Sequence, residues 1–119
     1  MALIGDIQEN FKRGTLEMLI LKLLSERDMY GYEMKSELET RSGSLLTIKD
    51  GSLYGPLYRL IGKNYISEHK ELAGARRVRV YYHLEPLGYD YLNLLTEEYD
   101  KISDGVKLVM EATKSQERN

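Results

Sequence analysis

Two short stretches hold residues that could bind an anion. In "GSLYGPLYRL", residues 51–60, the hydroxyls of Ser52 and Tyr54 and the guanidinium of Arg59 accompany two glycines and a proline. In "ARRVR", residues 75–79, three arginines fall within four positions at Arg76, Arg77 and Arg79. Hydroxyl and guanidinium groups donate hydrogen bonds to phosphate oxygens, and glycine lets a backbone approach one closely. The two stretches therefore favour a polyanionic ligand, although three arginines are also common on an ordinary solvated hairpin.

The charged residues are distributed unevenly along the chain, which has a net charge of −2. Residues 1–48 sum to −2, residues 49–84 to +4 and residues 85–119 to −4. A positive segment between two negative ones can direct a polyanion to one face while the remaining surface repels it. Both stretches described above lie in the positive segment.

Groups for catalysis or metal binding are scarce. The sequence has no cysteine, which excludes disulfides, thiolate metal sites and cysteine nucleophiles. His69 and His83 lack a third histidine for a metal site. Ser52 has no histidine at the spacing of a known nucleophile motif, and the usual glycine loops for phosphate are missing. We therefore expect a protein that is not an enzyme and has no cofactor or metal.

Composition indicates one domain in a reducing compartment. With 119 residues, of which 42% are apolar, the chain can fill one modest core. Asp6 and Glu9 interrupt the apolar start, and no later stretch approaches the ~20 apolar residues of a membrane span. We expect a soluble cytoplasmic protein without a membrane partner.

Apolar spacing predicts two helices in the first part of the chain. Ile4, Ile7 and Phe11 recur as on one side of a short helix, which is too short to be stable alone. Thr15 is a candidate N-cap for the strongly apolar run over residues 16–26. That run is expected to be the central core helix.

Two more helices are predicted before the basic hairpin. Asp28 is expected to open the second helix of the core, with Gly43 as the residue that follows its end. Residues 45–48 are apolar and partly β-branched, which is typical of a very short strand. The next helix contains the first anion-binding stretch and should end near residues 62–64. On its helical wheel Ser52, Arg59 and Lys63 share an outer strip, with Tyr54 at the opposite flank.

The remaining sequence predicts a hairpin and a long helix. Residues 65–71 and 78–84 have the character of strands, with a tip containing glycine and arginine between them. Pro86 suits the first turn of a helix that continues to about residue 113. The expected fold is mostly α with a small β-hairpin wing: a winged helix-turn-helix domain plus a long C-terminal helix. We divide it into a helical arm (1–14), the winged helix (15–85) and a dimerisation helix with its tail (86–119).

The last helix has an apolar seam that predicts self-association. Its members follow heptad spacing: Leu92, Leu95, Tyr99, Ile102, Val106 and Val109. We expect these helices to pair in a homodimer, with Ile4, Ile7 and Phe11 of each arm packing on the partner. Packing of the seam within its own chain is the alternative. A two-fold dimer would bind an inverted repeat with half-sites about one DNA turn apart.

Four separated blocks of the sequence resemble the PadR family of bacterial transcriptional regulators. They are "GTLEMLILKLL", "YGYEMKSEL", "GSLYGPLYRL" and "RVYYHLEPLGYDYL", in the same order and at similar spacing over roughly residues 12–95. The resemblance implies a winged-helix homodimer, with dimer contacts on the C-terminal helix, that represses genes for detoxification, efflux or stress responses. Ser52 stands where the family usually has threonine, and Gly55 where it usually has proline.

The resemblance also implies roles for particular residues. Tyr32 and Lys35 would lie near the DNA backbone, Ser52 and Tyr54 on the recognition helix, and the three arginines on the wing. Tyr32, like Tyr30, could instead be core packing. The full candidate DNA-binding set is Tyr32, Lys35, Lys49, Ser52, Tyr54, Arg59, Lys63, Arg76, Arg77 and Arg79.

Double-stranded DNA and a second copy of the chain are the expected partners. The alternative is a winged-helix module that assembles proteins without touching DNA. Ten tyrosines, and Tyr99 within the seam, are compatible with a cavity for a small aromatic effector, although tyrosines in a seam more often serve packing.

Overall fold

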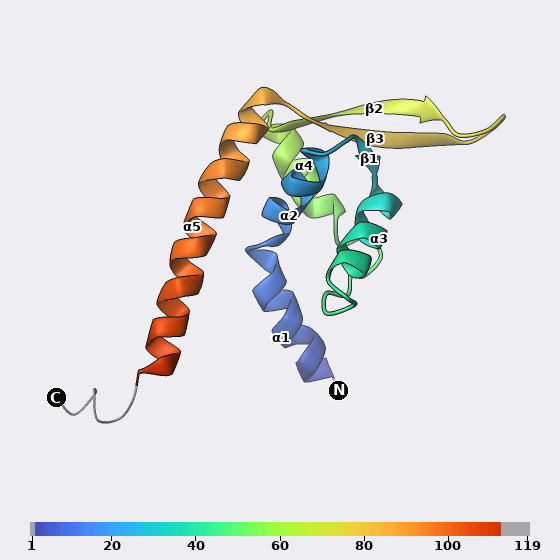
Figure 1. The fold of residues 1–119 in the computed structure, drawn as a ribbon. Coiled ribbons are helices and arrows are strands. Elements are labelled where there is room, and N and C mark those ends of the chain that lie inside the picture. The colour runs from blue at the N-terminus through green and yellow to red at the C-terminus, as the bar shows by residue number, and fades with distance from the viewer. Residues whose placement is uncertain (1, 113–119) are drawn as a thin grey trace.

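The computed structural model describes the backbone of residues 2–112 and the side chains of residues 7–112. Within this range the chain forms five helices and three strands (Figure 1). In chain order they are α1 (Ala2–Arg13), α2 (Leu16–Leu24), β1 (Met29–Tyr30), α3 (Gly31–Arg41), α4 (Tyr54–Gly62), β2 (Ile66–Leu72), β3 (Val78–Leu84) and α5 (Pro86–Glu111). The winged helix-turn-helix architecture and the long C-terminal helix are confirmed.

The core lies where α2 meets the other elements. This helix contacts α3, α4, β3 and α5, and its Ile20 and Leu21 are completely buried. Met34 of α3 and Leu60 of α4 are also completely buried. The apolar face of α4 thus fixes it to the core and leaves its other face free.

The sheet forms the top of this core in Figure 1. Its strands are antiparallel in the order β1-β3-β2, and β2 pairs with β3 from Ile66↔Leu84 to Leu72↔Val78. Ile66 and Leu84 are buried at the base of the hairpin, whereas Leu72 and Val78 are exposed at its far end. The outer half of the hairpin therefore projects beyond the helices as a wing (Figure 1).

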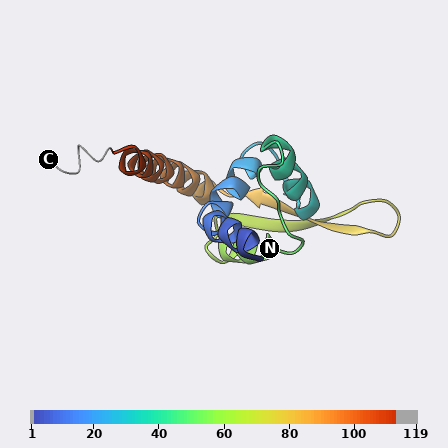
Figure 2. The same ribbon diagram turned by 90° about the horizontal axis from the view of Figure 1, so that it is seen from below.

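Helix α5 begins against the sheet and then leaves the body. Gly88 is buried there, and a Cβ at this position would lie 2.2 Å from the Tyr65 carbonyl oxygen and 2.4 Å from Leu84 Cδ1. Only glycine lets the first turn of α5 approach the sheet so closely. Farther along, α5 and the hairpin extend to opposite sides of the helical body (Figure 2). Among residues 2–112, no helix is both long and apolar enough to cross a membrane.

A buried lysine connects α1 to the loop before α4. The Lys12 ammonium donates a hydrogen bond to the Thr47 carbonyl oxygen and pairs with Glu9 at 3.1 Å. The Thr47 hydroxyl in turn donates to Gln8 Oε1 at 3.2 Å. Because a buried ammonium needs such partners, these contacts hold α1 against the segment that leads into α4.

The two predicted strands of the hairpin, the core helix after Thr15 and the start of α5 at Pro86 are confirmed. Gly43 follows the end of α3 with a φ of +60°, a conformation that glycine adopts readily. Thr15 is the N-cap of α2, as predicted, but its side chain makes no capping hydrogen bond. Its hydroxyl donates instead to the Lys12 carbonyl oxygen at 3.2 Å.

Two other boundaries differ from the sequence prediction. Helix α3 does not open at Asp28, because Met29 and Tyr30 form β1 and pair with Tyr82 and Tyr81 of β3. Residues 45–48 form a loop rather than a strand. The amide of Ile48, the one buried residue of this loop, donates to Glu39 Oε2 at 3.0 Å. A side chain of α3 therefore satisfies this amide in place of a strand neighbour.

Candidate nucleic-acid interface

The free face of α4 combines two glycines with exposed side chains. Pro56, Leu57 and Leu60 are buried, and at 100° per residue Gly55, Tyr58 and Gly62 fall near the centre of the opposite, exposed side. A Cβ built at Gly62 would meet no neighbouring atom within 4 Å, so this end of the helix can bring its backbone close to another molecule.

Tyrosines line one flank of the exposed face. Tyr54 and Tyr58 lie one turn apart and are both exposed. They lie near Tyr82 of β3: burial, followed by the charge of Glu68 and the two phenols, raises the pKa of Tyr82 above its ordinary value. Sequence reasoning included Tyr54 but missed Tyr58, although the four-residue spacing between the two could have indicated it.

Arg59 lies on the other flank of α4, against α2. Its Nε lies 2.9 Å from Glu17 Oε2, so the guanidinium is already paired although about half of its side chain is exposed.

Lys63 is exposed immediately after the helix ends. Ser52 precedes the helix, in a turn where its hydroxyl donates to the Lys49 carbonyl oxygen at 2.8 Å. The predicted strip of Ser52, Arg59 and Lys63 on one helical face is thus wrong, because α4 begins only at Tyr54.

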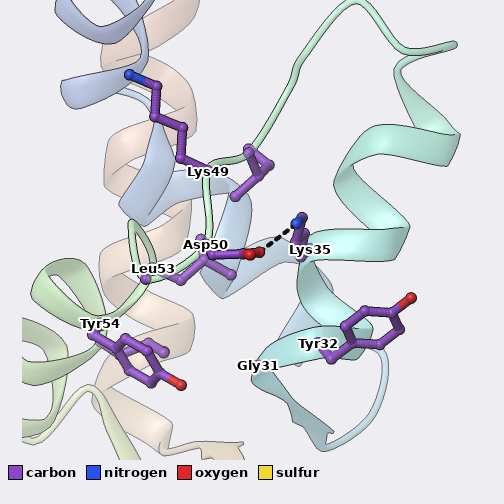
Figure 3. Close-up of a pocket in the computed structure, with 10 residues that line it drawn as sticks. Gly31, Tyr32, Lys35, Lys49, Asp50, Leu53 and Tyr54 are labelled. Atoms are coloured by element: carbon purple, nitrogen blue, oxygen red, sulfur yellow. Dashed lines mark hydrogen bonds and ion pairs between the residues drawn. The ribbon is translucent and has the colours of Figure 1, made fainter.

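A pocket lies between the start of α3 and the turn that precedes α4 (Figure 3). It has a volume of about 220 Å³, and Tyr32, Lys35 and Asp50 all line it. Lys35 Nζ lies 2.6 Å from Asp50 Oδ1. This hydrogen bond raises the pKa of Lys35 and lowers the pKa of Asp50. The pocket thus holds an ion pair between residues that lie 15 positions apart in sequence.

Other candidates near this pocket behave differently. Tyr32 is 72% exposed, so it is not core packing. Tyr30 is half-buried, with its ring 5.4 Å from that of Tyr81 in an edge contact. Lys49 lines the pocket with its backbone end, but its ammonium points away from Lys35 (Figure 3). Its charge instead contributes to the lowered pKa of Glu9 on α1, after the larger effect of Lys12.

The wing arginines occupy two environments. Arg76 and Arg77 are exposed in the connection between β2 and β3, which Gly74 turns with a φ of +90°. Arg79 lies within β3, and its guanidinium carbon is 4.4 Å from the centre of the Tyr30 ring. This cation–π contact holds Arg79, which pairs with Glu71 near the outer end of the strands, against β1, while the two tip arginines have no salt bridge to the side chains of residues 7–112.

The predicted seam of α5 divides into two parts. Leu92 is buried and the partly buried Leu95 packs beside it on the core of its own chain, so both have intrachain contacts, and their role in a dimer stays a prediction. Tyr99, Ile102, Val106 and Val109 are all exposed, from 46% to 75%.

Three of these four exposed seam residues, Tyr99, Ile102 and Val106, face a groove beside α1. This groove, of about 560 Å³, runs between the end of α1 and α5, with Phe11, Met18, Tyr99 and Ile102 among its lining residues. Phe11 is 78% exposed and Ile7 is 47% exposed. The side chain of Ile4 lies outside the described residues.

The two histidines lie on one face of the sheet near Asp28. His83 Nδ1 is 2.7 Å from Asp28 Oδ1, and His69 Nε2 is 2.8 Å from Glu71 Oε2. Over the side chains of residues 7–112, no group of three or more histidine, cysteine or acidic residues could hold a metal ion.

Known proteins are similar to this chain in sequence and in architecture. Residues 20–94 match the model of the transcriptional regulator PadR-like family. An uncharacterized protein X of Lysinibacillus sphaericus is 32% identical over 105 residues, which cover 88% of this chain and 96% of that protein. A transcriptional regulator from Clostridium thermocellum has a similar structure, with a TM-score of 0.77 at 30% identity over 82% of this chain and 95% of that one. A PadR family transcriptional regulator from Eggerthella lenta has a TM-score of 0.80 at 25% identity, over 94% and 96% of the two chains.

Proposed function

Because the chain belongs to the PadR-like family of transcriptional regulators, we propose that it is a homodimeric repressor that binds an inverted-repeat DNA site. The observation that carries this proposal is the exposed face of α4, where two glycines lie among the donor side chains of Tyr54, Tyr58 and Arg59. Such a face suits entry into the major groove, because its backbone can come close to DNA while the flanking groups reach phosphates and base edges.

The wing supplies a second contact in this proposal. Arg76 and Arg77 lie at the far end of the hairpin, well away from α4 (Figure 1). With α4 in the major groove, a hairpin of this reach can place arginines in the adjacent minor groove, where a narrow A·T-rich stretch strengthens the negative potential. Tyr32, Lys35 and Lys63 would contact the phosphate backbone.

The second half of α5 supports the homodimer. Exposed apolar residues continue along it, and the groove beside Phe11 is lined mostly by apolar surface. A contiguous apolar surface of this kind marks an interaction site. In the proposed dimer the α5 helices of two copies pair, and each arm, residues 1–14, packs against the partner beside residues 86–119. The winged helix, residues 15–85, then presents α4 to one half-site.

The proposed regulator acts in the cytoplasm on genes of detoxification, efflux or stress responses. Phe11 and Tyr99 line the groove between α1 and α5, so a flat aromatic effector could stack there. Such a ligand would act at the surface that also forms the dimer, which would couple its binding to the spacing of the two α4 helices.

One observation favours a different function, a protein-interaction module. Lys35 and Arg59 are already paired with the carboxylates of Asp50 and Glu17, so two of the candidate DNA-binding cations are not free. A module of this kind would use the same surface to bind another protein. Binding to DNA at low salt separates the two functions.

Salt dependence provides the test of DNA binding. We expect the wild-type protein to bind double-stranded DNA at low ionic strength. The logarithm of its association constant should then fall linearly with the logarithm of the salt concentration. Each phosphate that the protein neutralises contributes a slope of about −0.9, so roughly four contacts from each of the two protomers would give a slope near −7. Fluorescence anisotropy with a labelled duplex measures this slope. Absence of binding at low salt would favour the interaction module.

A further inference from the structure

Asp50 is the acidic residue that lines the pocket between α3 and the turn before α4, and the proposed function gives it no role. We propose that Lys35 is a binding site for a DNA phosphate, and that the carboxylate of Asp50 occupies this site in the free protein and so limits affinity for DNA. The inference rests on the proposed function, because the phosphate is that of the DNA backbone.

The two side chains of the Lys35–Asp50 ion pair differ in their exposure to solvent. Lys35 belongs to α3, and its side chain is 27% exposed, whereas the Asp50 side chain is 94% exposed. Most of the Lys35 side chain is therefore sheltered by the pocket, while the Asp50 carboxylate reaches the ammonium from solvent. An incoming anion could displace Asp50 into water without moving Lys35.

The backbone around Asp50 holds the carboxylate at this position. Asp50 lies in a turn in which the Ser52 amide donates to the Lys49 carbonyl oxygen at 3.1 Å, and Gly51 adopts a φ of +83°. The turn leads directly into α4. Asp50 is thus attached to the helix that enters DNA, and seating of α4 brings phosphates toward the position that the carboxylate occupies.

The pocket has the chemistry of a phosphate site with one cation. Ten residues line it, and of these only Lys35, Lys49 and Asp50 carry a full charge at neutral pH. Since the ammonium of Lys49 points away (Figure 3), Lys35 is the cation that faces the pocket. Tyr32 and Tyr54 also line it and carry phenols that can donate hydrogen bonds to a phosphate.

Exchange of the Asp50 carboxylate for a phosphate at Lys35 has a predictable effect on the affinity for DNA. Lys35 loses one charge-assisted hydrogen bond and gains another of similar kind. Asp50, displaced but still attached nearby, then repels the phosphate. Both effects reduce affinity for DNA, and removing the carboxylate should relieve both.

The test is a double-mutant cycle on DNA affinity. Asp50→Asn keeps the size of the side chain and removes its charge, and Lys35→Gln removes the cation. On a duplex of about 30 base pairs, long enough for two half-sites, we expect Asp50→Asn to bind about tenfold more tightly than wild type, since two protomers contact each duplex. In the Lys35→Gln background the same change should improve binding by only about twofold, because the competition for Lys35 no longer exists and only the repulsion of the phosphate by Asp50 remains.

Controls separate this competition from a general effect of charge. Asp90→Asn removes the same charge from the exposed start of α5 and should leave affinity within about twofold. Asp50→Ala should reproduce the gain of Asp50→Asn, which guards against an effect specific to asparagine, and thermal melts would verify that each variant folds.

Three results would overturn the inference. Asp50→Asn could bind no better than wild type, could improve binding equally with and without Lys35, or could match the Asp90→Asn control. In each case wild type still binds DNA and the proposed function stands. Failure of wild type to bind at low salt would instead remove the proposed function and the inference together.

Discussion

Replacing Ile102 with aspartate is expected to convert the protein to a monomer and to weaken its binding to DNA by at least about 100-fold. Ile102 is 65% exposed on α5 and lines the groove beside α1. In the proposed dimer the partner covers this position, so the substitution would bury an unpaired carboxylate, which costs on the order of 3 kcal/mol or more. Light scattering measures the mass, and anisotropy measures DNA affinity.

Leu94→Asp is the matched control for this prediction. Leu94 lies on the same helix and is 60% exposed, but it falls outside the heptad positions. A carboxylate there should stay in water and leave the dimer intact. If Ile102→Asp remained dimeric with unchanged DNA binding, or if both variants became monomeric, the proposed role of this seam would be refuted.

Loss of the two tip arginines is expected to weaken DNA binding about 30-fold at low salt. Arg76→Ala/Arg77→Ala removes two exposed cations from the tip of the wing, and the fold should tolerate the change because surface substitutions have small effects on stability. If each arginine contacts a phosphate, a dimer loses four contacts, and the magnitude of the salt slope should also fall by about 3.6. Anisotropy titrations at several salt concentrations measure both quantities.

A control for the wing variant removes equal charge elsewhere. Lys22→Ala/Lys101→Ala takes two exposed lysines from α2 and α5, where no DNA contact is proposed, and should change affinity only a few-fold through long-range electrostatics. Equal losses in the two double variants would mean that the wing acts only through net charge. An unchanged affinity for the arginine variant would exclude the wing from the interface.

Local sequence patterns predicted the helices and strands whose structure depends mainly on residues close by in the sequence. The apolar stripe of α2 and the alternating strand of β3 both follow a period visible in the sequence. Pro86 marks the start of α5, because proline is favoured in the first turn of a helix. These features depend on neighbours within a few residues, so one sequence is enough to find them.

Features that depend on distant neighbours were not predicted. Met29 and Tyr30 form a strand only because β3, more than 50 residues later, pairs with them. The loop at residues 45–48 looks strand-like in composition, but Glu39 of α3 satisfies the amide of Ile48. In both cases a tertiary contact outweighs the local preference.

The sequence predicted only part of the candidate interface, because the rest depends on contacts between residues distant in sequence. The exposed positions of Tyr32, Tyr54 and the wing-tip arginines agree with the prediction that they are available for contact. The partners of the cations were missed: nothing in the local sequence indicates that Asp50 would pair with Lys35, or Glu17 with Arg59. Their roles in DNA binding remain predictions.

Selection of duplexes from a random-sequence pool by the wild-type protein tests the central claim most directly. A homodimer that inserts one α4 helix per half-site should enrich an inverted repeat whose half-site centres lie about one helical turn, or 10–10.5 base pairs, apart. Enrichment of a single unpaired half-site would contradict the dimeric arrangement. Failure to enrich any sequence would contradict the claim that this protein recognises specific DNA.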